Sequence, residues 1–263
     1  MAAALALRRS GAVTGRLSVS HVALALLGVA IVIAVWQGTI AWYGLARIVL
    51  PTPFEVASTL AHLFASRSFW HDVLVSLREF LLGYAIGGVL GVLVGTILGE
   101  RPTARMTVGP VIEALRFIVP FAWIPLTVLW FGTSLTGKVV LVAYAVFFVM
   151  VVTTARSIVT VDPTLTRVGT MLGMGPAGIA LKVHLRAAAP GIASGAKAAA
   201  ALGWIAVVAA EYIGASAGLG VMITNASMSL ATATVIAGMI VIGIIGATVS
   251  WLVGRTTAAW LNY

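Results

Sequence analysis

Six stretches of this chain are apolar over about 20 residues each, the length that an α-helix needs to cross a membrane. They lie near residues 22–43, 80–99, 108–131, 139–158, 191–213 and 234–253. Only 9% of the 263 residues are charged, whereas a soluble domain carries about 25%. The sequence therefore predicts an all-α, polytopic membrane protein with about six transmembrane helices. It excludes a water-soluble enzyme, a nucleic-acid-binding protein and a disordered chain.

The distribution of basic residues predicts the orientation of these spans. Residues 1–20 carry three arginines and no acid. The apolar stretch after them is longer than the core of a signal peptide, so we expect it to remain as a transmembrane helix. If residues 1–20 are cytoplasmic, most of the 16 lysines and arginines fall on the same side. This asymmetry predicts that both termini are cytoplasmic.

The residues between the first two spans suggest a surface helix. Pro51 and Pro53 open a polar stretch over residues 50–79, and apolar side chains recur at helical spacing from Phe54 to Phe64. This pattern is typical of a short amphipathic helix at the membrane surface. We therefore divide the chain into a cytoplasmic segment (1–20), a first span with an outer amphipathic segment (21–79) and a core (80–263).

A second polar segment, at about residues 160–190, lies on the predicted cytoplasmic side. Asp162 and Pro163 open it, glycines interrupt it from Gly173 to Gly178, and Pro190 closes it. The pattern predicts a helix–turn–helix with its turn near residues 172–178. A segment of this kind has an obvious use as a docking surface for a soluble partner.

The sequence shows no catalytic or metal-binding arrangement. Residues 132–139 look like a phosphate-binding loop, but Val139 stands where Ser or Thr would hold magnesium, and no strand precedes them. The four histidines lack the spacing of a metal site, and the chain has no cysteine. We therefore predict that the chain is not an enzyme, that it binds no metal or cofactor, and that any ATP hydrolysis comes from another polypeptide.

Charged residues and prolines at membrane depth are candidates for lining a path for a solute. Glu113 and Arg116 share a helix face and either pair with each other or line a hydrophilic path. Pro120 and Pro125 break the third span, which is either a kinked packing helix or the wall of a cavity. The candidate path residues are Arg116, Pro120, Trp123 and Glu211.

Glycines recur every fourth residue in the second span, at positions 83, 87, 91, 95 and 99. They form one stripe along a helix, where a neighbouring backbone can approach closely. The stripe fits either packing within the chain or a subunit interface.

The segment at 160–190 resembles the coupling segment of ABC-importer permeases. That family carries roughly E-A-A, a glycine four residues further on, and then a hydrophobic-Leu-Pro sequence. Here residues 167–169 (Arg-Val-Gly) stand at the E-A-A positions, Gly173 matches the glycine, and Leu185-Arg186 stands where Leu-Pro is usual. The resemblance covers about residues 50–260. It includes residues 50–53, 116–125, 129–132, 209–211 and 218–220, and it points to the nitrate, taurine and aliphatic-sulfonate branch.

This resemblance implies a type I ABC-importer permease in a bacterial inner membrane. Such a permease pairs with a second copy, usually of itself, and binds two cytoplasmic ATPases that carry ATP and magnesium. A periplasmic or lipid-anchored protein delivers the solute, here expected to be a small anion or zwitterion. ATP binding would push the coupling segments and alternate access between the two sides. The residues that the resemblance assigns to ATPase docking are Asp162, Arg167, Gly169, Leu172, Gly173, Met174, Gly175, His184 and Pro190.

Three other functions compete with this interpretation. A secondary transporter would carry inverted repeats and several buried ionisable groups, and it would need no long cytoplasmic segment. A membrane scaffold would bind partners without moving a solute, and an intramembrane enzyme would need a base and a nucleophile or metal ligands at depth. The sequence favours the importer over all three.

Overall fold

The computed structural model describes residues 19–44, 46–212 and 215–261, which form helices and contain no strand. The chain divides into two compact units, residues 1–57 and residues 58–263. In the first unit, α2 (Val19–Tyr43) is followed by the start of α3 (Pro53–Ala65). The Trp36 indole N–H donates to the Pro51 carbonyl at 3.1 Å.

A reciprocal capping box starts α3. The Thr52 amide donates to Glu55 Oε2 at 2.9 Å, and the Glu55 amide donates to Thr52 Oγ1 at 3.2 Å. Two amides that the helix itself leaves unpaired are satisfied in this way. The amphipathic helix predicted near residues 54–64 is therefore confirmed as α3, while its position at a membrane surface stays a prediction.

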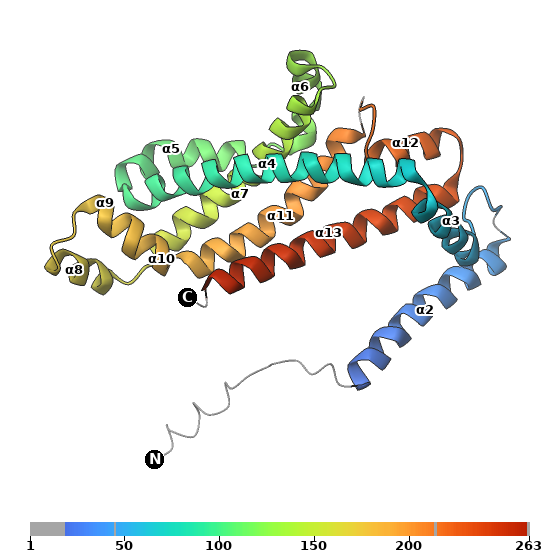
Figure 1. The fold of residues 1–263 in the computed structure, drawn as a ribbon, viewed down its shortest axis with the longest axis horizontal. Coiled ribbons are helices and arrows are strands. Elements are labelled where there is room, and N and C mark those ends of the chain that lie inside the picture. The colour runs from blue at the N-terminus through green and yellow to red at the C-terminus, as the bar shows by residue number, and fades with distance from the viewer. Residues whose placement is uncertain (1–18, 45, 213–214, 262–263) are drawn as a thin grey trace. The chain divides into compact units, whose positions relative to one another are not determined.

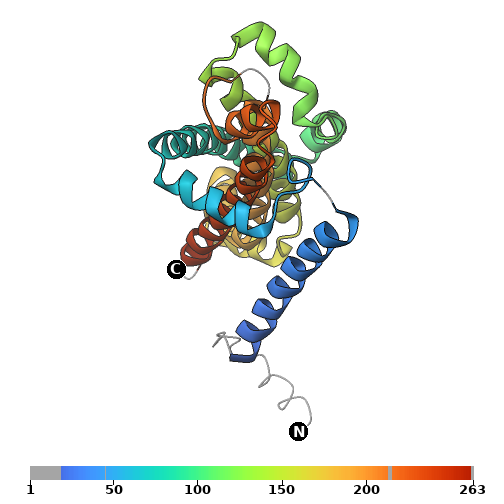
Figure 2. The same ribbon diagram turned by 90° about the vertical axis from the view of Figure 1, so that its right-hand side faces the viewer.

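Four long helices run side by side in the second unit (Figure 1): α4 (Arg67–Glu100), α7 (Leu135–Val159), α11 (Ala189–Glu211) and α13 (Thr232–Leu261). Each is long and apolar enough to cross a membrane. Their shared core includes Phe80, Val146 and Trp204. Figure 2 looks along this bundle from the end where α12 (Leu219–Met228) lies. We call this the α12 end.

The opposite end of the bundle, here the α8 end, carries the segment between α7 and α11 (Figure 1). It consists of α8 (Pro163–Met171), α9 (Pro176–Gly178), the π-helix η3 (Ile179–His184) and α10 (Leu185–Ala187). The predicted helix–turn–helix is confirmed. Its turn includes Gly173, whose φ of 75° is a conformation that glycine adopts without strain.

The third predicted span is broken in two. Helix α5 (Pro102–Leu115) is followed by the 3₁₀ turn η2 (Pro120–Trp123) and by α6 (Ile124–Phe131), and the two halves meet at 83°. The described residues therefore contain four spanning helices, or five if the bent pair counts as one, and a shorter apolar helix at Leu27–Tyr43. A total of six spans stays a prediction.

One predicted boundary was wrong. Residues 67–79 were expected to lie outside the second span, but they are the first part of α4. Phe69, Ser76 and Glu79 are buried there against the rest of the bundle. Lys138, one residue outside the predicted span 139–158, is likewise buried within α7. Glu79 and Lys138 are shielded because they pair with each other, while Arg67 and Arg78 stay exposed.

The glycine stripe packs α4 against α7. A methyl group on Gly83, Gly87, Gly91, Gly95 or Gly99 would collide with α7. The atoms it would meet belong to residues 142, 143, 150, 154 and 158. Lipid gives no hydrophobic drive for helix association, so close backbone approach supplies the contact. Of the two alternatives left by the sequence, packing within the chain is the one observed.

Two neighbouring glycines of α4 provide a test of this packing. Gly87→Ala places a methyl group against the Ala143 backbone, whereas Gly88 has nothing within 4 Å of its would-be Cβ. We expect Gly87→Ala to cost about 1–3 kcal/mol through overpacking. Gly88→Ala should be neutral or stabilise by up to about 1 kcal/mol through helix propensity. Thermal unfolding of both variants in detergent measures the difference, and equal midpoints would contradict the packing role.

Candidate functional site

A broken helix beside α7 and α11 forms the first part of the site. Pro120 and Pro125 have no amide hydrogen, so carbonyls in the preceding turn lose their helical partners. The Tyr144 hydroxyl from α7 lies 2.6 Å from the Leu115 carbonyl and 3.2 Å from the Ile118 carbonyl, and can donate to either. The break predicted from the two prolines is confirmed. Tyr144 was missed, because nothing near it in the sequence connects it with the break.

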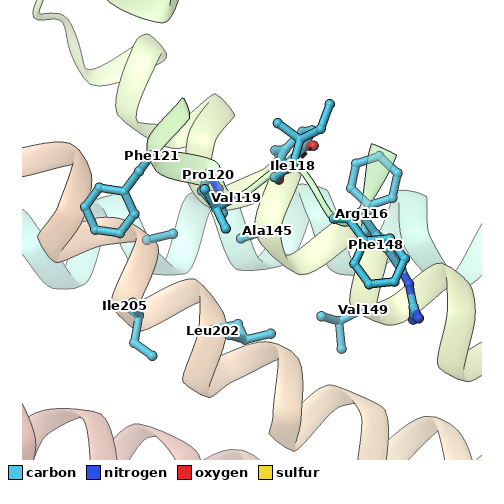
Figure 3. A pocket seen from close by; sticks show the side chains of 13 residues that line it. Arg116, Ile118, Val119, Pro120, Phe121, Ala145, Phe148, Val149, Leu202 and Ile205 are labelled. Atoms are coloured by element: carbon cyan, nitrogen blue, oxygen red, sulfur yellow. Dashed lines mark hydrogen bonds between the residues drawn. The ribbon is translucent and has the colours of Figure 1, made fainter. Parts of the chain in front are cut away.

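A cavity of about 350 Å³ opens beside this break. Residues 116–121 form one wall, and side chains of α7 and α11 form the others (Figure 3). Leu202 and Ile205 of α11 lie across from Val119 and Pro120, and Arg116 lies at one side near Phe148. Most of the residues that line this cavity are apolar, and Arg116 is the charged residue among them.

A second cavity, of about 550 Å³, lies between α4, α5 and α7 toward the α8 end. Arg105, Glu113 and Arg156 line it. Glu113 lies 2.7 Å from Arg116 Nε and 3.5 Å from Arg156 Nη2. The predicted pairing of Glu113 with Arg116 is thus observed. With three arginines and one glutamate, the linings of the two cavities carry an excess of positive charge, which attracts anions.

Trp123 and Glu211, also predicted as path residues, line neither cavity. The Trp123 ring lies 5.4 Å from the ring of Tyr144, which does line the first cavity. The buried Nε1 of Trp123 has no hydrogen-bond partner within the described part of the chain. Glu211 lies at the end of α11 and is only 1% exposed.

The Glu211 carboxylate organises the α12 end. It accepts from Ser76 Oγ at 2.5 Å and from the Gly220 amide at 2.7 Å. Gly218, with a φ of 129°, leaves room for it, since a Cβ there would collide with the Glu211 carboxyl group. The sequence pointed to Glu211 and to Gly218–Gly220 separately, and the structure brings them together.

Further polar contacts extend this network along α4. Asp72 accepts from the Gly218 amide and Ser76 Oγ accepts from the Leu219 amide, each at 3.0 Å. One turn further, Lys138 Nζ donates to Glu79 Oε1 at 2.5 Å, with the two side chains 10% and 2% exposed. A buried ion pair therefore fastens α7 to α4 at the α12 end.

The pairing of Lys138 also resolves the phosphate-loop resemblance of residues 132–139. In a true phosphate loop the lysine reaches the nucleotide, but here it is committed to Glu79. Gly132, with a φ of 64°, ends α6, and Ser134 immediately precedes α7. Within the described ranges, no group of three histidines and acids is placed to hold a metal.

The segment at the α8 end presents an apolar surface. Leu165, Val168, Met171 and Leu172 are 43%, 48%, 85% and 74% exposed. Arg167 is exposed among them. Asp162 caps α8 by accepting from the Thr164 amide at 2.8 Å, and this hydrogen bond lowers the pKa of the Asp162 carboxyl. A fixed helix thus displays large apolar side chains that nothing in the described chain covers.

The other residues predicted for docking divide between surface and interior. Gly173 and Gly175 lie exposed in the turn, and Pro190 is exposed in the first turn of α11. Gly169 is buried, and a Cβ there would press on Ile179 at 3.3 Å. Met174 and His184 are half-buried. These last three residues hold the segment together, so their side chains contribute little to its outer surface.

Comparison with known proteins agrees with this architecture. Residues 87–259 match the family described as binding-protein-dependent transport system inner membrane component. The chain belongs to this family. The permease is 32% identical to the taurine transport system permease protein TauC of Escherichia coli K12, over 86% of this chain and 84% of TauC. It is 28% identical to the nitrate import permease protein NrtB of Leptolyngbya laminosa, over 71% and 66% of the two chains.

The fold is also seen in a solved structure. A chain of the MetNI methionine ABC transporter, in an inward-facing conformation, superposes with a TM-score of 0.62 and 22% identity, covering 73% of this chain and 95% of that one. The predicted ABC-importer permease fold is therefore confirmed. The permease is an inner-membrane component, and its family works with ATPase subunits and a solute-binding protein.

The buried ion pair gives a prediction for the stability of the permease. Lys138→Met leaves the Glu79 carboxylate buried without its cation, which should cost about 3–5 kcal/mol. Adding Glu79→Gln should recover most of that loss. Lys197→Met, at an exposed position in α11, is the matched control. Thermal unfolding in detergent measures all three, and a Lys138→Met variant as stable as the control would contradict the assignment.

Proposed function

We propose that the cavity beside the break in the third span is part of the path for a small anionic or zwitterionic solute, such as a sulfonate or nitrate. The single observation that carries this proposal is the position of Arg116 in an apolar cavity, next to a second cavity with two more arginines. A guanidinium in such a setting suits a sulfonate, carboxylate or nitrate group. Relatives named for taurine and nitrate transport support the same class.

Within this path, Arg116 and Pro120 contact the solute directly. Trp123 acts through Tyr144, whose ring it contacts. The Tyr144 hydroxyl donates to carbonyls at the helix break, and its side chain lines the cavity. Glu211 does not contact the solute. It holds the α12 end of the bundle in place, and the solute passes that end.

We propose that the exposed face of α8 receives a cytoplasmic ATPase, which binds the ATP and magnesium. Large apolar side chains rarely stay exposed on a water-facing helix unless a partner covers them. Arg167 in this face adds a cation where the family has an acid, and this favours an ATPase groove with a complementary acidic residue. In this arrangement the α8 end and both termini are cytoplasmic, two permease copies form the path, and each copy binds one ATPase.

The docking surface is tested by changing the most exposed apolar residue of α8. Met171→Glu should abolish recovery of the ATPase with the tagged permease in mild detergent, because a carboxylate cannot replace the buried methionine in an apolar interface. Met228→Glu, at an equally exposed methionine of α12, should leave recovery unchanged. Equal recovery with both variants would show that α8 does not dock the ATPase.

The solute path is tested by changing the charge at Arg116. In proteoliposomes with the ATPase and the binding protein, Arg116→Gln should reduce taurine uptake by about tenfold, the loss expected for one charge-assisted hydrogen bond. Arg116→Lys should retain part of it. ATPase recovery with each variant shows that the complex is intact. Uptake by Arg116→Gln at the wild-type rate would remove Arg116 from the path.

A further inference from the structure

One polar contact joins the docking segment to α4. Glu100 is the last residue of α4, where a carboxylate faces the negative end of the helix dipole and weakens the helix. Its Oε1 lies 2.7 Å from His184 Nδ1 at the end of η3, and the side chains are 23% and 14% exposed. An acid at this position does not stabilise α4, but it gives His184 a hydrogen-bond partner.

The second ring nitrogen of His184 extends the contact into α8. Its Nε2 lies 2.8 Å from Thr166 Oγ1. In the neutral ring, Nδ1–H donates to the Glu100 carboxylate and Nε2 accepts from the threonine hydroxyl. One imidazole thus bridges α8 and α4, which are far apart in the sequence.

The local backbone is unusual where His184 lies. Residues 179–184 form a π-helix, a rare conformation that is often found at functional sites. The buried Ile179 at its start contacts Gly169 of α8. Apolar packing therefore holds η3 against α8, and the hydrogen bonds of His184 provide the polar connection onward to α4.

We propose that His184 is a positioning residue that transmits movement of α8 to α4, through the chain Thr166–His184–Glu100. The inference rests on the proposed function, in which α8 receives the ATPase. From Glu100, α4 runs unbroken to Ser76 and Asp72, which hold the first residues of α12. A push on α8 therefore reaches the opposite end of the bundle through one rigid helix.

The chain offers closely matched variants for a test. Thr166→Val removes the hydroxyl with little change of shape, and Thr166→Ser retains it. Thr170→Val makes the same change one turn further along α8, where the hydroxyl donates to the Thr166 carbonyl of its own helix. His184→Phe removes both ring nitrogens, and Glu100→Gln keeps an acceptor for Nδ1–H.

Three measurements on the full chain test the proposal. Because the chain has no cysteine, spin labels on cysteines at the exposed positions 101 and 164 report the distance between the end of α4 and α8. In the ATPase complex in proteoliposomes, taurine uptake per ATP hydrolysed reports transmission. Recovery of the ATPase with the permease reports docking separately.

We expect His184→Phe and Thr166→Val to widen the distance distribution and to lower uptake per ATP, by about tenfold for His184→Phe. ATPase recovery should be unchanged. Thr166→Ser, Thr170→Val and Glu100→Gln should stay close to wild type, a rescue that a general loss of folding would not show.

The proposal would be overturned if His184→Phe kept the wild-type label distances. It would also be overturned if this variant kept the wild-type uptake per ATP hydrolysed. Loss of ATPase recovery in that variant would also overturn it, by making His184 a docking residue. If the wild-type chain itself recovers no ATPase, the docking proposal fails. The label distances on the chain alone would then still decide whether His184 joins α8 to α4.

Discussion

Backbone contact between α4 and α7 sets the spacing of the bundle. The five glycines of α4 face α7 residues from Val142 to Ile158, so the two helices stay in close contact along most of their length. Lipid does not drive apolar helices together, and the approach therefore depends on the absence of side chains on one of them. At this separation Lys138 reaches Glu79, and the end of α4 reaches His184.

The charged groups of α4 lie in its first part and at its last residue, and the two ends are tied to different elements. Asp72, Ser76 and Glu79 hold the start of α12 and the beginning of α7, while Glu100 holds the segment between α7 and α11. Between these ends the glycines pack on α7, and the Tyr84 hydroxyl donates to the Ala196 carbonyl of α11 at 3.0 Å. Such a helix is suited to act as a rigid strut. The broken third span is different, because its backbone depends on the Tyr144 hydroxyl.

Much of the fold followed from the sequence because a membrane imposes a length on each helix and proline and glycine mark the breaks. The helix–turn–helix at 160–190 and the break at Pro120 were predicted on that basis. The first turns of α4 were not, because Asp72 and Glu79 were taken as signs of an exposed loop. Charges suggest exposure unless their partners are known, and the partners of Asp72 and Glu79 lie 146 and 59 residues away in the chain.

The same reasoning explains where the candidate path residues lie in the structure. Pro120 was predicted from a local break and Arg116 from a charge at membrane depth, and both line the cavity beside the break. Glu211 was predicted from the cost of a carboxylate at membrane depth, but that cost can be met by structure as well as by a solute. Here Ser76 and the Gly220 amide satisfy both carboxylate oxygens. A buried acid with all its partners in the protein has little capacity left for a passing ligand. A half-exposed arginine that shares one glutamate with another arginine retains that capacity.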